Sequence, residues 1–367
     1  MRIIVDVNHP AQVHCFKNFV REMKGRGHEV LVTATEKEVS LKLLDSFGYD
    51  YVNLGSYGNN LVMKLLNIPV IDIKMYLAVR KFRPDIFIGL GTIRGAHVSF
   101  IMRRNCIVLE DTECSRDQIM LYLPFVKDVL TTSNFKMDLG KKQIKLNTFK
   151  ELAYLHPDHF RPDPSVLEAV GLKPGERFIV VRFISWGASH DVGYHGIEDR
   201  KAVVMELEKY GRVFVSSEND LEPELLKYRI TLPPDKLHDL LYYAALYFGE
   251  GGTTASEAAL LGTHAILIDP EAKQCGVFYD LHSYGLLSFF DRTEDGMAAA
   301  KKLLEDPGLV ASGKEKRMKL ASEKLDLTKF LEWFVENYPG SADMTKNDPA
   351  VQKRFMGVEV ANHPVPP

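Results

Sequence analysis

The chain has 367 residues, with 46 Lys and Arg against 49 Asp and Glu, and a formal net charge of −3. Hydrophobic residues make up 46% and charged residues 26%, which are ordinary globular values and exclude disordered, collagen-like and coiled-coil classes. The near-neutral charge argues against a nucleic-acid binder, because neutralising phosphates needs a basic excess. A single hydrophobic core stops growing near ~250–300 residues, so about two domains are expected.

Several patterns bear on location. No apolar run reaches the ~18 residues that would span a bilayer. The apolar run at Met1–Val7 is too short for a signal peptide and contains an early Asp. The cysteines are scattered without a CxxC pair, which disfavours zinc sites and disulfides: Cys15, Cys106, Cys114 and Cys275. We therefore expect a cytoplasmic protein that needs no metal, with at most peripheral contact with the inner face of a membrane.

The first part of the chain alternates strand-like and helix-like segments. Strands are predicted at Arg2–Val7, Glu29–Ala34, Tyr51–Leu54, Pro84–Gly89, Cys106–Leu109 and Asp128–Thr131. Helices are predicted from Val13 to Met23, at Lys37–Phe47, and along Leu61–Phe82, where Pro69 should interrupt the helix. This alternation implies a parallel, doubly wound sheet.

The rhythm stops between about Leu139 and Gly175, where four prolines and many charges indicate a connection between domains. A second alternating series follows. Its strands are predicted at Arg177–Phe183, Val213–Ser216, Leu246–Gly249 and Ala265–Ile268, and its helices at Lys201–Tyr210, Lys236–Ala245 and from about Thr254. We expect an N-terminal Rossmann-like domain over residues 1–160 and a C-terminal one over 170–325. A helix at 326–338 and a loosely ordered tail at 339–367 complete the chain.

The most informative segment is Gly249–Ala258, which follows an apolar strand and opens a helix. Glycines let the backbone approach a ligand, and free N–H groups at a helix N-terminus bind phosphate. Thr253 and Thr254 add hydroxyl donors, and Glu257 lies where a carboxylate can accept hydrogen bonds from ribose hydroxyls. The alternative is a tight strand–helix turn with a capping Thr and a Glu favoured by the helix dipole.

Residues Glu250–Gly262, with Ala265–Pro270 after them, resemble the donor-site signature of GT-B glycosyltransferases. The pattern is similar to that of the N-acetylglucosaminyltransferase that makes the second lipid-linked peptidoglycan precursor, and to that of UDP-N-acetylglucosamine 2-epimerase. The resemblance implies a diphosphate bound by Gly251, Gly252, Thr253 and Thr254. It also implies that Glu257 binds ribose and that Gln274 lies against the donor sugar.

The chain from Met1 to Asn337 resembles an uncharacterised prokaryotic family of GT-B-like proteins, catalogued as a domain of unknown function. The residues that carry the resemblance are Asp6–His14, Val181–Phe183, Trp186–Asp191 and the glycine segment. It implies an α/β, GT-B-like fold in which two Rossmann-like, doubly wound parallel-sheet domains face a cleft. It also implies that the helix at 326–338 packs back on the N-terminal domain. It does not identify the reaction.

Two histidines, His9 and His14, follow the first strand, at the carboxyl edge where open α/β sheets bind ligands. A histidine with a near-neutral pKa is a suitable base for an acceptor hydroxyl. The alternative is that His14 is a buried residue early in the helix. The sequence does not tell which of the two lies nearer the chemistry.

The segment Arg182–Gly196 follows the first strand of the second series. Arg182 can pair with a diphosphate bidentately, and Ser189 and His190 can donate to phosphate oxygens. The alternative is a long surface loop whose Ser or Asp caps a helix.

Acidic residues follow another strand, at Glu110, Asp111 and Glu113. We interpret Asp111 as part of an acidic helix start and keep Glu110 and Glu113 as candidate acceptor-site groups. Gly89–Gly95 misses the GxGxxG spacing, so a nicotinamide site is disfavoured, and His97 after it is interpreted as structural.

The stretch Leu61–Tyr76 is apolar with interspersed Lys. Such a stripe is more often core, and the alternative is a segment that rests on a membrane near a lipid-linked acceptor.

Our leading hypothesis is metal-independent transfer of a sugar from a nucleotide-diphosphate sugar to an unknown acceptor, with His14 or His9 as base. One alternative is a non-hydrolysing sugar-nucleotide 2-epimerase, for which Glu110, Glu113 or Asp191 would supply acidic groups. Another is a nucleotide-sugar-binding protein without catalysis. The sequence does not identify the base, the sugar, the acceptor, the stereochemical outcome or the oligomeric state.

Overall fold

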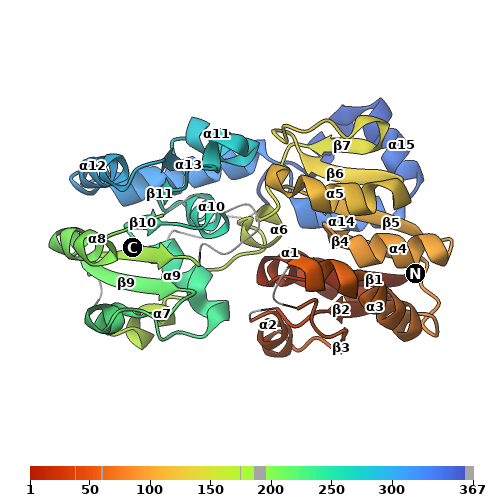
Figure 1. The fold of residues 1–367 in the computed structure, drawn as a ribbon. Coiled ribbons are helices and arrows are strands. Elements are labelled where there is room, and N and C mark those ends of the chain that lie inside the picture. Colours follow the sequence, from red (N-terminus) through yellow and green to blue (C-terminus); the bar gives the residue numbers. More distant parts are fainter. Residues whose placement is uncertain (38, 59–60, 174, 186–195, 360–367) are drawn as a thin grey trace. The chain divides into compact units, whose positions relative to one another are not determined.

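The computed structural model describes residues 1–37, 39–58, 61–173, 175–185 and 196–359 (Figure 1). The chain divides into two compact units. Met1–His159 and Lys324–Gly357 form the first, called here the N-terminal unit. Phe160–Glu323 form the body of the second, the C-terminal unit, which also takes the chain end from Val358.

The N-terminal unit is built on seven parallel strands in the order β3-β2-β1-β4-β5-β6-β7. The strands are β1 (Arg2–Val7), β2 (Glu29–Ala34), β3 (Tyr51–Asn53), β4 (Ile86–Leu90), β5 (Asn105–Glu110), β6 (Asp128–Thr132) and β7 (Gln143–Leu146). The order reverses direction between β1 and β4, as in doubly wound sheets. Ligands in such sheets bind beyond the carboxyl ends of the strands at this reversal.

Helices cover the sheet. They are α1 (Pro10–Gly25), α2 (Ser40–Ser46), α3 (Leu61–Val79), α4 (Ile93–Ile101), α5 (Arg116–Tyr122), α6 (Leu152–Leu155), α14 (Leu327–Glu336) and α15 (Gly340–Asn347). Helix α1 begins where Pro10 fixes the first turn and buries Phe16, Phe19 and Met23 at helical spacing. Helix α14 packs against α1, so the late helix belongs to this unit.

Two local expectations are wrong, and a third, the connection at about Leu139–Gly175, is wrong only at its start, because the boundary between the units falls inside it, after His159. Pro69 lies inside a continuous α3, because the inner residues Ile71 and Met75 are buried in the core and hold the helix together. The expected connection contains β7, which extends the sheet beside β6. The tail expected to be loose forms α15 and a 3-10 helix at Pro349–Phe355, with Ala342 and Val351 buried.

The C-terminal unit has five parallel strands in the order β12-β11-β10-β8-β9. They are β8 (Phe178–Phe183), β9 (Arg212–Ser217), β10 (Leu246–Gly249), β11 (Ala265–Ile268) and β12 (Leu287–Phe290). The helices are α7 (Ser165–Ala169), α8 (Arg200–Leu207), α9 (Leu237–Tyr243), α10 (Gly252–Leu260), α11 (Gly276–Ser283), α12 (Thr293–Leu304) and α13 (Leu309–Glu323). The order reverses between β8 and β10, so the predicted pair of doubly wound parallel sheets is confirmed.

Each unit has a hydrophobic core of its own. Val181 and Phe248 of the two strands at the reversal lie in the core of the C-terminal unit. Phe87 of β4 and Val108 of β5 lie in the core of the N-terminal unit. Among the helices of the described residues, none combines the length and apolar composition needed to cross a membrane.

Candidate functional site

The turn between β10 and α10 is tightly packed at two glycines. A Cβ on Gly249 would lie 2.2 Å from the carbonyl oxygen of Arg182, and one on Gly252 would lie 2.4 Å from Phe278 Cζ. Gly251 between them has a φ of +84°, in the left-handed region that favours glycine. The backbone of this turn is therefore packed directly against β8 and α11 where α10 begins.

Arg182 lies beside this turn, at the end of β8. A Cβ on Gly251 would be 3.5 Å from Arg182 Nε. The guanidinium donates to Ser216 Oγ at 2.8 Å and to Glu218 Oε1 at 2.7 Å, both at the end of β9. A fixed guanidinium next to the start of a nine-residue helix is an arrangement that binds anions. The structure thus brings two predicted groups, Arg182 and the glycine turn, together.

The two threonines of the helix start differ in access. Thr254 is buried, whereas Thr253 is partly exposed. Glu257 is also buried, and its Oε1 lies 3.0 Å from Nε2 of His238 on α9. His238 is a residue that the sequence analysis missed. Glu257 therefore has a structural partner in this structure, and ribose binding stays a prediction.

Glu250 is a second residue whose role the sequence analysis missed. Its side chain is fully buried, and its two oxygens accept the backbone N–H of Ile184 at 2.8 Å and that of Ile197 at 2.6 Å. These contacts fix both ends of the stretch that carries Ser189 and His190, which lie outside the described residues. The sequence signal that could have pointed to a buried role for Glu250 is a single charged residue within a turn of small residues.

Gln274 is exposed at the end of a short 3-10 helix, Ala272–Gln274, that follows β11. Strands β8, β10 and β11 are parallel neighbours, so their carboxyl ends lie at one edge of the sheet. Arg182, the glycine turn and Gln274 consequently follow three adjacent strands at that edge. This is the edge at which open α/β sheets bind ligands.

The predicted catalytic histidines belong to the other unit. His9 is the N-cap of α1, where its Nδ1 accepts the backbone N–H of Ala11 at 3.2 Å. His14 is only 6% exposed and packs edge-on to Phe47, with its ring centroid 5.6 Å away, and against Tyr154 at 5.4 Å. These surroundings match the alternative of a packed core histidine. A catalytic role for either residue stays a prediction.

Glu110, at the end of β5, has the chemistry of an acid or base. Burial, followed by the charge of Asp111, raises the pKa of Glu110 to about 7. Hydrogen bonds from Tyr122 Oη at 2.8 Å and from the backbone N–H of Thr112 at 3.1 Å oppose that rise. Glu110 Oε2 also lies 3.4 Å from the position of a Cβ on Gly91, after β4. A carboxyl group with a near-neutral pKa at this edge can exchange protons.

The other acidic residues and His97 have structural partners. Asp111 forms an ion pair with Lys150, and Glu113 accepts the backbone N–H of Lys136 at 3.1 Å. His97 contacts Asp72 through Nδ1 at 2.7 Å, which gives it the structural role expected.

A buried ion pair holds the strand reversal of the N-terminal unit together. Arg94 Nε donates to Asp6 Oδ1 at 2.7 Å, and Thr92 Oγ1 donates to Asp6 Oδ2 at 2.6 Å. A Cβ on Gly89 would lie 2.7 Å from Thr92 Cγ2. Close packing against Thr92 accounts for Gly89 here, while the Asp6–Arg94 pair was not foreseen.

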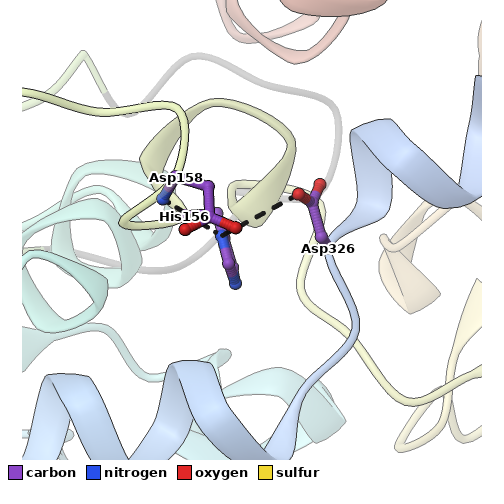
Figure 2. A group of neighbouring side chains, drawn as sticks. All are labelled: His156, Asp158 and Asp326. Carbon is purple, nitrogen blue, oxygen red and sulfur yellow. Dashed lines mark hydrogen bonds and ion pairs between the residues drawn. The ribbon is translucent and has the colours of Figure 1, made fainter. Parts of the chain in front are cut away.

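One group of the described residues has the composition of a metal site. His156 Nδ1 lies 3.8 Å from Asp158 Oδ2 and 3.9 Å from Asp326 Oδ2, and Figure 2 shows both carboxylates turned toward the ring. Lys329 Nζ lies 3.1 Å from Asp158 Oδ2, and His159 Nε2 lies 2.8 Å from Asp326. A cation here would have to displace the lysine ammonium, so we assign the group a structural role at the start of α14.

Comparison with known proteins identifies the family. Residues 1–323 match the family described as "Protein of unknown function (DUF354)". The chain belongs to the DUF354 family. An uncharacterised protein from Methanocaldococcus jannaschii is 22% identical over 280 residues, which cover 73% of this chain and 81% of the relative. The resemblance to an uncharacterised GT-B-like family is thereby confirmed.

Solved structures place the DUF354 chain among GT-B folds. The UDP-GlcNAc 2-epimerase of Neisseria meningitidis, bound to UDP-GlcNAc, is 13% identical and has a TM-score of 0.65, over 92% of this chain and 100% of that one. The Streptomyces sp. SF2575 glycosyltransferase SsfS6, complexed with thymidine diphosphate, is 16% identical with a TM-score of 0.59, over 91% and 99%. Similarity at these identities shows the fold, so the predicted GT-B-like class is confirmed.

Proposed function

We propose that this DUF354 protein binds a nucleotide-diphosphate sugar at the carboxyl edge of the C-terminal unit and transfers the sugar to an acceptor hydroxyl. The observation that carries the proposal is the Arg182 guanidinium beside the glycine turn that opens α10. That pairing supplies a fixed cation and helix N–H groups to one anion. Structures of the same fold that hold UDP-GlcNAc and thymidine diphosphate support the choice of ligand class.

In this proposal the diphosphate lies at the start of α10, held by Gly251, Gly252, Thr253, Thr254 and Arg182, with Ser189 and His190 as further donors. Glu257 accepts the ribose hydroxyls, and Gln274 contacts the sugar. The bond between the anomeric carbon and the diphosphate oxygen breaks as the acceptor oxygen attacks that carbon. His14 or His9 takes the acceptor proton. The helix dipole and Arg182 stabilise the leaving diphosphate, so the reaction needs no metal ion.

A thermal-shift screen with UDP, GDP, CDP, dTDP and ADP, with and without magnesium, tests the ligand class. We expect one nucleotide to raise the melting temperature without magnesium, because a ligand of the native state stabilises it by mass action. Arg182→Gln should weaken that binding roughly tenfold or more, the contribution of a charge-assisted contact. Arg229→Gln, at an exposed arginine of the same unit, is the matched control and should leave binding unchanged. A melting temperature that no nucleotide moves would refute the donor site.

A second candidate function is epimerisation of the sugar nucleotide, and Glu110 is the observation that favours it. Inversion at a carbon next to the anomeric centre requires removal and return of a proton, and a carboxyl group with a pKa of about 7 suits that task. The fold is shared with an enzyme described as a 2-epimerase.

Incubating UDP-GlcNAc with the protein in D2O, without any acceptor, separates the two functions. Transfer predicts an unchanged donor until an acceptor is added. Epimerisation predicts deuterium at the sugar C2, detected by mass spectrometry, and loss of that exchange in Glu110→Gln. Nucleotide binding with neither reaction, across a panel of acceptors, would support a binding protein.

A further inference from the structure

Helix α3 carries apolar residues on two opposite sides. Its inner side buries Ile71, Met75 and Val79 in the core of the N-terminal unit. Its outer side exposes a second apolar stripe at helical spacing: Leu66 (70% exposed), Val70 (46%), Ile73 (60%) and Leu77 (49%). A surface helix normally has a polar outer face, so this exposed apolar stripe indicates a surface that binds a partner or a membrane.

Helix α4 extends the same surface. The contact between His97 on α4 and Asp72 on α3, 2.7 Å long, holds the two helices side by side, and they are adjacent in Figure 1. At the end of α4, Phe100 is 60% and Ile101 is 62% exposed. We call the six exposed residues Leu66, Val70, Ile73, Leu77, Phe100 and Ile101 the α3–α4 face.

The charge around this face is strongly positive. Arg94 is buried in its ion pair with Asp6; the rest of residues 61–104 carry seven Lys and Arg against two Asp, a net charge of +5 in a chain whose total is −3. Exposed cations follow the ends of both helices: Arg80, Lys81, Arg83, Arg103 and Arg104. The strands that come next, β4 and β5, pair with Ile86 opposite Asn105, so these cations gather at one edge of the sheet. Arg2, Arg80, Lys81 and Arg83 also line an open hollow there, with Glu29 and Phe82.

Two of these arginines occupy a backbone conformation that favours glycine. Arg83 has a φ of 53° and Arg103 a φ of 54°, and among the described residues they are the non-glycine positions with positive φ. Arg103 directly follows the C-cap residue Met102 of α4, a position that usually takes Gly, and Arg83 lies in the turn between α3 and β4. At these two positions the chain thus carries a cation where glycine would fit with less strain.

We propose that the α3–α4 face and its flanking cations dock this protein on an anionic phospholipid surface. The exposed apolar side chains would enter the headgroup boundary, and the arginines would pair with lipid phosphates. A two-fold contact with a second copy would bring two positively charged segments face to face, whereas anionic headgroups complement them. The inference is independent of the proposed function.

Vesicle co-sedimentation of the full chain tests the proposal. We expect binding to vesicles of phosphatidylcholine mixed with phosphatidylglycerol, little binding to phosphatidylcholine alone, and loss of binding as salt is raised. Arg83→Gly with Arg103→Gly should weaken partitioning roughly 30-fold, since each surface cation contributes about fivefold. The same variant should unfold at an equal or higher temperature, because glycine relieves the left-handed backbone.

A second variant tests the apolar contribution. Leu66→Gln with Ile73→Gln should also reduce vesicle binding while leaving the inner side of α3 unchanged. Two control variants alter exposed residues of the C-terminal unit: Met205→Gln with Leu226→Gln for the apolar change, and Lys302→Gln with Lys319→Gln for the charge. Both controls should bind vesicles as the unaltered chain does.

Three results would overturn the proposal. One is equal binding to neutral and anionic vesicles, and another is anionic binding that both face variants retain. The third is a stable dimer by analytical ultracentrifugation that Leu66→Gln with Ile73→Gln dissociates, without vesicle binding by either form. That last result would assign the face to a second copy of the chain.

Discussion

At the scale of single residues, three buried glutamates are stabilised in three different ways. Glu250 accepts two backbone N–H groups, Glu257 contacts the imidazole of His238, and Glu110 is held by a tyrosine hydroxyl and backbone N–H groups against strong desolvation. Burying a carboxylate is costly unless hydrogen bonds or charges compensate for the lost water. At Glu110 burial raises the pKa to about 7, so we expect this carboxyl group to exchange protons near neutral pH.

The raised pKa of Glu110 predicts a pH-dependent stability. The folded state holds the proton to about pH 7, whereas the unfolded chain releases it near the ordinary value of 4.5. The protonated Glu110 therefore contributes its full share to the free energy of unfolding below about pH 4.5. That contribution, roughly 3 kcal/mol in all, is lost as the pH rises through 7. Urea unfolding of the unaltered chain and of Glu110→Gln at several pH values measures it. The difference between the two free energies should change over this window, and a constant difference would contradict the assignment.

Glu257 and His238 give a second prediction at this scale. Removing either partner leaves the other buried without it, so Glu257→Ala and His238→Gln should each lower the free energy of unfolding by about 1–3 kcal/mol. If Glu257 also binds ribose, only Glu257→Ala should weaken nucleotide binding tenfold or more, as measured by calorimetry. Equal affinities in the two variants would leave Glu257 a structural residue.

At the scale of elements, the start of α10 is fixed by contact between backbone and ring. We predict that Gly252→Ala lowers the free energy of unfolding by about 2 kcal/mol, because the new Cβ would lie 2.4 Å from Phe278 Cζ. Adding Phe278→Leu should recover part of the loss, since the smaller side chain leaves room. Urea unfolding of the two single variants and the double variant measures this coupling. Additive losses would mean that Phe278 does not set the position of the helix start.

The alternation of strands and helices was predictable because local patterns determine it. Strands β1, β2 and β10 coincide with short β-branched or apolar runs of the sequence. The glycine-rich composition of the segment after β10 likewise predicts a turn. The continuation of α3 through Pro69 was not predictable, because tertiary burial of Ile71 and Met75 outweighs the local effect of proline. Strand β7 is only four residues long and lies in a proline-rich stretch, so its pairing with β6 decides its conformation.

At the scale of the whole molecule, the candidate site was predictable where its residues lie in one segment or directly follow a predicted strand. Gly249 to Glu257 form one continuous turn and helix, and Arg182 joins them because β8 pairs with β10. The partners His238 and Asp6 were missed because they act on residues distant in sequence, Glu257 and Arg94. The sequence pattern gives residue types and their spacing. Contacts between side chains far apart in the sequence depend on the order of the strands, which the pattern does not give.

Because each unit has its own core, ligand binding should leave a local signature. We predict that a bound nucleoside diphosphate slows amide hydrogen exchange in residues 249–257 and around Arg182. The N–H groups at the start of α10 would become acceptor-bound and open less often. Hydrogen-exchange mass spectrometry with and without the nucleotide measures this, and Arg182→Gln provides the matched control, in which the protection should disappear at the same ligand concentration. Protection confined to peptides of the N-terminal unit, with none at 249–257, would place the nucleotide elsewhere and remove the basis for sugar transfer at this edge.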